Sequence, residues 1–214
     1  MNSVHVDFSC GNITLEGEWH FPQGKGPSPA VVVCHPHSLY GGNMSNNVVV
    51  AICESLLQNS VAAFRFNFRG AGKSGGTFGG GIAEKQDIRA ALDLASSTSN
   101  IDPTRIGLAG YSFGGSVALP IAIEDERVGL LALVSPALLD TGWKQLEEYS
   151  RPKLVIVGNA DSVIQLERFR QCISDVHDPT QYQLVSGADH FWLGFEQELT
   201  QRVTRFFVAG FGSG

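Results

Sequence analysis

The sequence predicts an α/β protein built on a mostly parallel, doubly wound sheet that begins with an antiparallel pair of strands. Short, continuous apolar runs alternate with segments of helical periodicity along nearly the whole chain. This alternation is typical of parallel strands joined by crossover helices that cover both faces of the sheet. Such strands are buried on both sides, which explains their continuous apolar character. The first two runs differ, because only Gly11-Asn12 joins them, as in a hairpin.

The individual elements follow from this periodicity. The predicted strands are residues 4–8, 13–20, 30–34, 61–68, 105–110, 128–135, 153–158 and 181–185. Apolar residues at helical spacing predict helices near 49–57, 88–95, 113–123, 166–173 and 195–207. The chain has 214 residues, 43% of them hydrophobic. We therefore expect a single domain spanning residues 1–214.

Composition and charge exclude several classes of function. The net charge is -6 and no basic cluster occurs, so we expect no nucleic-acid partner. No apolar run is long enough to cross a bilayer, and the first residues do not resemble a signal peptide. The four cysteines match neither a zinc site nor a redox motif. We expect a cytoplasmic protein without a membrane partner, and the sequence leaves its oligomeric state open.

The stretch "NFRGAGKSGG" fits three motifs at once. Gly70, Gly72 and Gly75 match a dinucleotide loop, Gly72-Lys73-Ser74 ends a phosphate-binding loop, and Ser74 sits in a Gly-x-Ser-x-Gly pattern. Each of these sites needs a helix that begins within or directly after the motif. The chain continues with more glycines, and the next helical pattern begins only near Ile82. We therefore interpret this stretch as a flexible loop at the edge of a site.

A second Gly-x-Ser-x-Gly motif, centred on Ser112, has the context that the first one lacks. A buried strand leads into it, and a helix rich in small residues leads out. A serine at a sharp turn between strand and helix is exposed to substrate and lies at a helix N-terminus. Ser112 is therefore the candidate nucleophile.

A serine nucleophile needs a base, which in this kind of site follows it in the sequence. Two histidines lie beyond Ser112. His177 lies in a polar stretch before the last strand, where an exposed loop histidine is expected. His190 directly follows the last strand, at the sheet edge where ligands bind. His190 is the candidate base.

The base in turn needs a carboxylate to orient it. Asp161 follows the strand 153–158 and is the candidate acid, although it could instead cap a helix that starts at Ser162. Asp140 is the second candidate. Asp189 adjoins His190, and neighbouring residues usually point apart.

Two backbone N–H groups are needed to stabilise the oxyanion. Phe113, the residue after the nucleophile, should supply one of them. The loop after strand 30–34 should supply the other, and since Pro36 has no N–H, His37 is the candidate. His35 and His37 could also form a zinc pair, but no third ligand lies nearby. We expect no metal and no cofactor.

These motifs resemble those of the α/β-hydrolase superfamily, specifically its small, cap-less, dienelactone-hydrolase-like serine hydrolases. The similar segments are "HPHSLYGGNMSNNVV", "RFNFRGAGKSGG", "GYSFGG", "GNADSV" and "GADHFW", so the resemblance covers nearly the whole chain. It implies a catalytic triad of Ser112, Asp161 and His190, with oxyanion N–H groups at His37 and Phe113. It also implies that Arg69 is an internal anchor. Dienelactone hydrolases proper use a cysteine nucleophile, so the serine here makes their substrate doubtful.

The resemblance leads to a prediction of activity. Between strands 128–135 and 153–158 the chain is too short for a cap of several helices, so we expect an open site. The protein should be a carboxylesterase-type serine hydrolase of small acyl esters, with thioesters and lactones as further possibilities. A catalytically silent binding module is the alternative function. The sequence does not tell whether Tyr111, Phe113, Phe191 and Trp192 line the pocket or the core.

Overall fold

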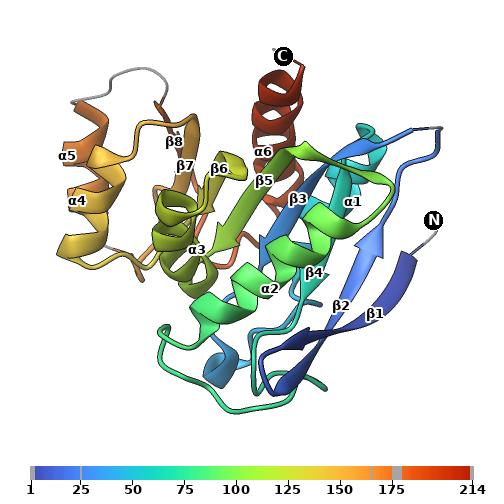
Figure 1. Cartoon of the computed structure of the whole chain (residues 1–214). Coiled ribbons are helices and arrows are strands. Elements are labelled where there is room, and N and C mark those ends of the chain that lie inside the picture. Colours follow the sequence, from blue (N-terminus) through green and yellow to red (C-terminus); the bar gives the residue numbers. More distant parts are fainter. Residues whose placement is uncertain (1–2, 25, 165, 175–179, 213–214) are drawn as a thin grey trace.

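The computed structural model describes residues 3–24, 26–164, 166–174 and 180–212. These residues form one eight-stranded sheet with the order β1-β2-β4-β3-β5-β6-β7-β8 (Figure 1). The strands are β1 (Ser3–Cys10), β2 (Ile13–His20), β3 (Ser28–Cys34), β4 (Ala62–Phe66), β5 (Ile101–Tyr111), β6 (Val128–Val134), β7 (Lys153–Gly158) and β8 (Thr180–Val185).

The pairing of the strands confirms the predicted fold class. Strands β3 to β8 pair in parallel, whereas β1 and β2 form an antiparallel hairpin that joins the sheet through β4. The register pairs Cys10 with Ile13, so the hairpin turn is the expected two residues. Strands β3, β6 and β7 and the second half of β5 are almost completely buried, in agreement with their apolar sequences.

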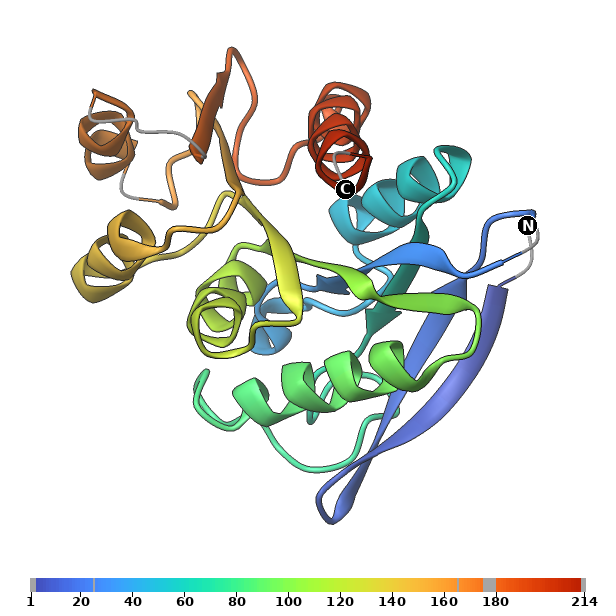
Figure 2. The same ribbon diagram turned by 45° about the horizontal axis from the view of Figure 1, so that its top comes forward.

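Helices cover both faces of the sheet. They are η1 (Ser38–Tyr40, a 3-10 turn), α1 (Asn47–Gln58), α2 (Glu84–Ser97), α3 (Phe113–Glu124), α4 (Asp140–Glu148), α5 (Leu166–Ser174) and α6 (Glu196–Phe211). Figure 2 shows α1 and α6 together on one face, and α2, α3 and α4 on the other. Each face has its own apolar cluster, one around Phe64, Leu108 and Trp143 and the other around Ile52, Trp192 and Phe207.

The sequence prediction missed helix α4. Its nine residues are mostly polar, and the helix is held by Trp143 and Leu146, which are completely buried. Helix α4 packs beside α3 and is the one helix of the β6–β7 connection, so this segment forms no cap of several helices. None of the helices in the described part of the chain combines the length and apolar character needed to cross a bilayer.

The strand order fixes where a site can form. Strand β3 lies between β4 and β5. The chain therefore adds β4 on one side of β3 and then crosses back to add β5 on the other side. In such sheets, ligands bind at the carboxyl ends of the strands, near the point where the order reverses. In Figure 1 the loop after β4 and the turn η1 lie along the lower edge of the molecule, below the arrowhead of β5.

Candidate active site

Ser112 occupies a strained turn between β5 and α3. Its φ of 54° and ψ of -116° are angles that residues with side chains rarely adopt, at a typical cost of about 1–3 kcal/mol. The surrounding backbone holds this conformation. The N–H of Ser112 donates to the Val134 carbonyl at 2.9 Å, and its own carbonyl accepts the N–H of Gly115 at 3.0 Å. The hydroxyl is thus fixed at the N-terminus of α3.

The glycines around Ser112 are required by close packing. A Cβ atom at Gly110 would lie 2.6 Å from the carbonyl oxygen of Gly114, inside the turn itself. A Cβ atom at Gly114 would lie 2.5 Å from the carbonyl oxygen of Cys34, the last residue of β3. The first turn of α3 therefore packs directly against the backbone at the end of β3, where the next loop begins.

The structure brings the three predicted triad side chains together. Nε2 of His190 lies 3.0 Å from Oγ of Ser112, and Nδ1 of His190 lies 2.9 Å from Oδ2 of Asp161. An ionised carboxylate can only accept, so the imidazole proton lies on Nδ1. Nε2 is then the atom that accepts the Ser112 hydroxyl proton. All three side chains are buried against neighbouring loops.

The loops that carry the acid and the base are joined by their backbones. The N–H of Ala160, next to Asp161, donates to the carbonyl of Ala188 at 3.0 Å. The hydroxyl of Tyr111 donates to the carbonyl of His190 at 2.7 Å. Tyr111 of β5 and the loops after β7 and β8 thus hold one another in place, although Asp161 and His190 are 29 positions apart along the chain.

The surroundings of Asp161 favour its ionised form. Burial alone would raise the pKa of this carboxyl, but hydrogen bonds from His190, the Val163 N–H and Ser135 outweigh it, so the pKa is lowered. The Val163 N–H donates to Oδ1 at 2.9 Å. Asp161 therefore caps the turn at Val163 with the oxygen that does not face His190, but the helix that the sequence suggested from Ser162 begins only at Leu166.

Ser135 is a site residue that the sequence reasoning did not single out. It is completely buried directly after β6, and its Oγ contacts Asp161 and accepts a hydrogen bond from Nε1 of Trp192 at 3.1 Å. Both Ser135 and Trp192 have positive φ, 40° and 60°. The signal available in the sequence was a hydroxyl directly after a buried strand, beside the strand that carries the acid.

The two candidate oxyanion residues are neighbours in space. The rings of His37 and Phe113 lie 4.8 Å apart. As the first residue of α3, Phe113 has an N–H without a partner inside the helix. The N–H of His37 takes no part in the backbone hydrogen bonds of the described loops. The loop with His37 therefore packs against the residue that follows Ser112, and the role of the two N–H groups as oxyanion donors stays a prediction.

His35 anchors the loop that carries His37. Its Nδ1 donates to the carbonyl of Pro36 at 2.6 Å, and its Nε2 accepts the Phe68 N–H at 3.0 Å. Burial lowers the pKa of His35 to about 4, so the ring is neutral. Both ring nitrogens are engaged, and neither is free to bind zinc as the alternative interpretation required.

The glycine-rich loop is a structural element. Helix α2 begins only at Glu84, which confirms that no helix follows the motif directly. Ser74 is buried, accepts the Glu16 N–H at 3.1 Å and donates to the carbonyl of Asn67 at 2.7 Å. Arg69 pairs with the completely buried Asp87 at 2.6 Å, in the role of an internal anchor.

The alternative candidates for the acid and the base were Asp189, Asp140 and His177. Oδ1 of Asp189 accepts the N–H groups of Phe191 and Trp192, both at 2.9 Å, so this carboxylate stabilises the turn after the base. The side chain of Asp140 and the whole of His177 lie outside the described residues.

The aromatic side chains near the triad divide between core and surface. Tyr111 and Trp192 are buried and belong to the core. Phe113 is half-buried, and Phe191 is 58% exposed. The hollows of about 720 and 680 Å³ beside α6 are not lined by Ser112, Asp161 or His190.

Comparison with known proteins identifies the family. The model of the dienelactone hydrolase family matches residues 80–203, a span that includes Ser112, Asp161 and His190. The chain belongs to the dienelactone hydrolase family. This confirms the resemblance drawn from the sequence motifs, and it places the protein among hydrolases. Within this family the chain carries serine at the position of the candidate nucleophile.

Solved structures with the same architecture support this assignment. An alpha-beta serine hydrolase homologue from Coxiella burnetii is 31% identical, with a TM-score of 0.86 over 96% of this chain and 97% of that one. A serine hydrolase without a lid from Xanthomonas campestris is 24% identical, with a TM-score of 0.82 over 96% and 94%. Est1E from Butyrivibrio proteoclasticus, solved with ferulic acid, is 20% identical, with a TM-score of 0.85 over 97% and 99%. The last two show the fold alone.

Proposed function

We propose that this member of the dienelactone hydrolase family is a carboxylesterase-type serine hydrolase. One observation carries the proposal: the unbroken hydrogen-bond series from Ser112 through His190 to Asp161, at 3.0 and 2.9 Å. This series gives the serine a base and the base an orienting carboxylate. The strained turn at Ser112 supports the same conclusion, because such strain is typical of functional residues.

In the acylation step, the ester carbonyl lies against the backbone N–H groups of His37 and Phe113. Oγ of Ser112 attacks the carbonyl carbon while its proton passes to Nε2 of His190. The negative charge on the former carbonyl oxygen is stabilised by the two N–H groups and the N-terminus of α3. His190 then gives its proton to the leaving alcohol oxygen, the C–O bond breaks, and an acyl-Ser112 ester remains.

In the deacylation step, His190 takes a proton from a water molecule that attacks the acyl carbonyl. The tetrahedral intermediate uses the same oxyanion site, and collapse returns the proton to Oγ of Ser112. The products are a carboxylic acid and an alcohol, and the enzyme is restored. Asp161 remains ionised throughout and stabilises the imidazolium that forms twice in each cycle. Every step uses side chains and backbone groups of this chain, so the proposal includes no cofactor.

The test compares the wild type with Ser112→Ala in the hydrolysis of p-nitrophenyl acetate and butyrate. We expect turnover by the wild type and a loss of at least about 10³-fold in Ser112→Ala, which retains only the oxyanion site. A methyl hydroxycinnamate belongs in the same panel, because the structural neighbour Est1E is solved with ferulic acid. If both proteins are folded and equally inert, the function is that of the silent binding module instead.

A further inference from the structure

Large apolar side chains on the surface are concentrated around the proposed active site. Among the described residues, eleven large apolar side chains are exposed, and seven of them follow the carboxyl ends of strands. These seven are 57–87% exposed, whereas the other four are only 38–46% exposed. We call the seven the apolar rim: Leu39, Tyr40, Ile82, Leu139, Val163, Phe191 and Leu193. Exposed apolar side chains that gather at one place usually mark a binding surface.

Contacts connect one part of the apolar rim to the oxyanion loop. The ring of Tyr40 lies 4.8 Å from that of His37, which in turn lies 4.8 Å from the ring of Phe113. A Cβ atom at Gly81, next to Ile82, would lie 3.4 Å from the Phe113 ring. Tyr40 thus contacts the candidate oxyanion residue His37, and Ile82 adjoins a glycine that lies beside the Phe113 ring.

The other part of the apolar rim adjoins the triad. The ring of Phe191 lies 5.7 Å from that of His190, edge to face. Val163 donates its N–H to Asp161. Leu139 is two residues from Ala137, whose N–H donates to the carbonyl of Ser112 at 3.3 Å. The residues of the apolar rim thus come from the loops after five different strands, at the edge of the sheet where Ser112 lies.

The same loops contain few charges. Residues 35–46, 67–83, 135–139, 159–164 and 186–195 contain four charged side chains among 50 residues, about half the 17% of the whole chain. Arg69 pairs with Asp87, Asp161 contacts His190, and Asp189 accepts backbone N–H groups. Lys73 is the remaining charge in these loops.

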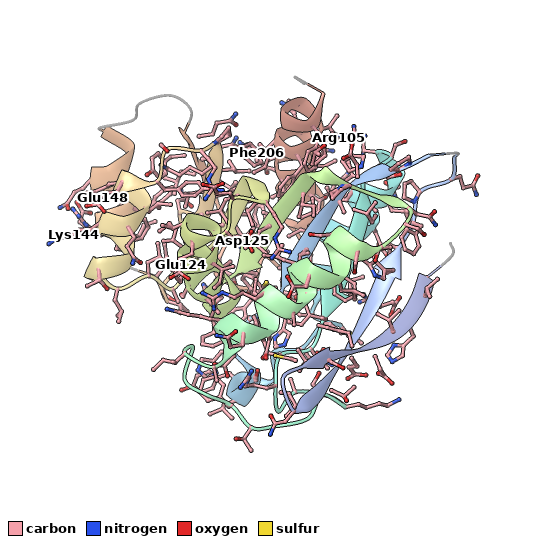
Figure 3. The ribbon with its side chains drawn as sticks, in the orientation of Figure 1. Arg105, Glu124, Asp125, Lys144, Glu148 and Phe206 are labelled. Atoms are coloured by element: carbon pink, nitrogen blue, oxygen red, sulfur yellow. The ribbon has the colours of Figure 1, made fainter. Side chains whose placement is uncertain are left out.

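The more charged parts of the surface lie elsewhere. Figure 3 labels Lys144 and Glu148 on α4, Glu124 and Asp125 at the end of α3, and Arg105 near the amino end of β5. Arg105 lies at the upper edge of this view, whereas the loop after β4 runs along the lower edge (Figures 1 and 3). An anionic group bound over Ser112 would lose hydration against apolar side chains, and besides Arg69, which pairs with Asp87, only Lys73 is a cation in these loops.

We propose that the apolar rim selects uncharged esters with extended apolar acyl groups, and disfavours substrates that carry a carboxylate or phosphate. This inference rests on the proposed esterase function of Ser112. The occupant of the rim is the acyl chain of the substrate itself. Each CH₂ that the rim removes from water should raise kcat/KM by about two- to fourfold, until the chain outgrows the rim.

The experiment measures kcat/KM for p-nitrophenyl acetate, butyrate, hexanoate and octanoate below their aggregation concentrations. Mono-p-nitrophenyl suberate is the matched anionic substrate, since it has the octanoate chain length with a terminal carboxylate. We expect kcat/KM to rise from acetate to at least hexanoate, and octanoate to exceed suberate by about tenfold or more. A flat or falling chain-length series, or suberate equal to octanoate, would overturn the proposal.

Variants separate the apolar rim from the rest of the surface. Ile82→Ser combined with Leu193→Ser should lower the ratio of hexanoate to acetate kcat/KM by about fivefold or more. Val208→Ser is the control, because Val208 is an exposed apolar residue on α6, away from the rim, and should leave the ratio unchanged. Equal ratios in all three proteins would contradict the proposal.

The oligomeric state and the labelling of Ser112 complete the test. If sedimentation shows a dimer that the rim double variant dissociates, a second copy of the chain covers the rim and the proposal is wrong. If no ester is hydrolysed and a fluorophosphonate leaves Ser112 unlabelled, the proposed function itself fails and this inference fails with it. Hydrolysis with labelling but without chain-length preference would refute the inference alone.

Discussion

His35 should make the stability of this protein depend on pH. Burial lowers the pKa of His35 to about 4, against the ordinary 6.5 that it regains on unfolding. Between these values the unfolded chain binds a proton that the folded chain does not. Stability therefore falls as the pH drops below about 6.5, and the loss is complete below about 4.

The interval between 6.5 and about 4 sets the size of this effect. The free energy of unfolding falls by about 3 kcal/mol in total, of which about 2 kcal/mol is already lost at pH 5. This is a large fraction of the stability of an ordinary domain. His20 is also buried with a lowered pKa and contributes in the same direction, so only a comparison with a variant isolates His35.

The comparison uses His35→Gln and His35→Asn, two amides that do not titrate. At pH 7.5 each variant should be less stable than the wild type by about 1–3 kcal/mol, because the hydrogen bonds to Pro36 and Phe68 are disturbed. Urea unfolding followed by tryptophan fluorescence gives the free energies. At pH 5 the difference between wild type and variant should shrink by about 2 kcal/mol. An unchanged difference at the two pH values would refute the assignment of His35 as a buried neutral histidine.

The residues around Ser112 lead to three further predictions. Gly114→Ala should sharply reduce folded yield or Tm, because the added Cβ would lie 2.5 Å from a backbone oxygen. Gly129→Ala is the control: its Cβ would lie 3.8 Å from the nearest atom, so it should be tolerated in the same assay. Ser135→Ala should lower kcat about tenfold with little change in KM. The reason is that Asp161 loses one hydrogen bond of about 1.5 kcal/mol and keeps its other donors. A change in KM alone would contradict this role of Ser135. Asp161→Asn should lower kcat about 10³-fold or more with Tm within a few degrees, and steady-state kinetics that match the wild type would exclude its orienting role.

Much of the fold could be predicted because its elements follow from local patterns. Continuous apolar runs identified strands such as β3 and β7, since a strand covered on both faces has no polar side. Helix α4 could not be predicted in this way. It is short and mostly polar, and the burial of Trp143 against α3 and α5 stabilises it. Such packing between distant segments leaves no periodic pattern in the local sequence.

The same distinction applies to the candidate site. Ser112, Asp161 and His190 could be predicted to lie near one another because each follows a parallel strand at the same edge of the sheet. The contact of Ser135 with Asp161 and Trp192 depends on two positive-φ residues 57 positions apart, which only the folded chain brings together. The anchoring role of His35 likewise depends on its contact with Phe68, which joins the loops after the neighbouring strands β3 and β4.

The most direct test of the proposed mechanism is covalent labelling of the intact protein. A fluorophosphonate reacts with a serine only where a base activates its hydroxyl, so the mass of the labelled protein and its peptide map report on Ser112 itself. We predict one adduct on Ser112 in the wild type, none in Ser112→Ala, and labelling slowed by about 10³-fold in His190→Ala. An adduct on another serine, or equal labelling of the wild type and His190→Ala, would contradict the proposed mechanism.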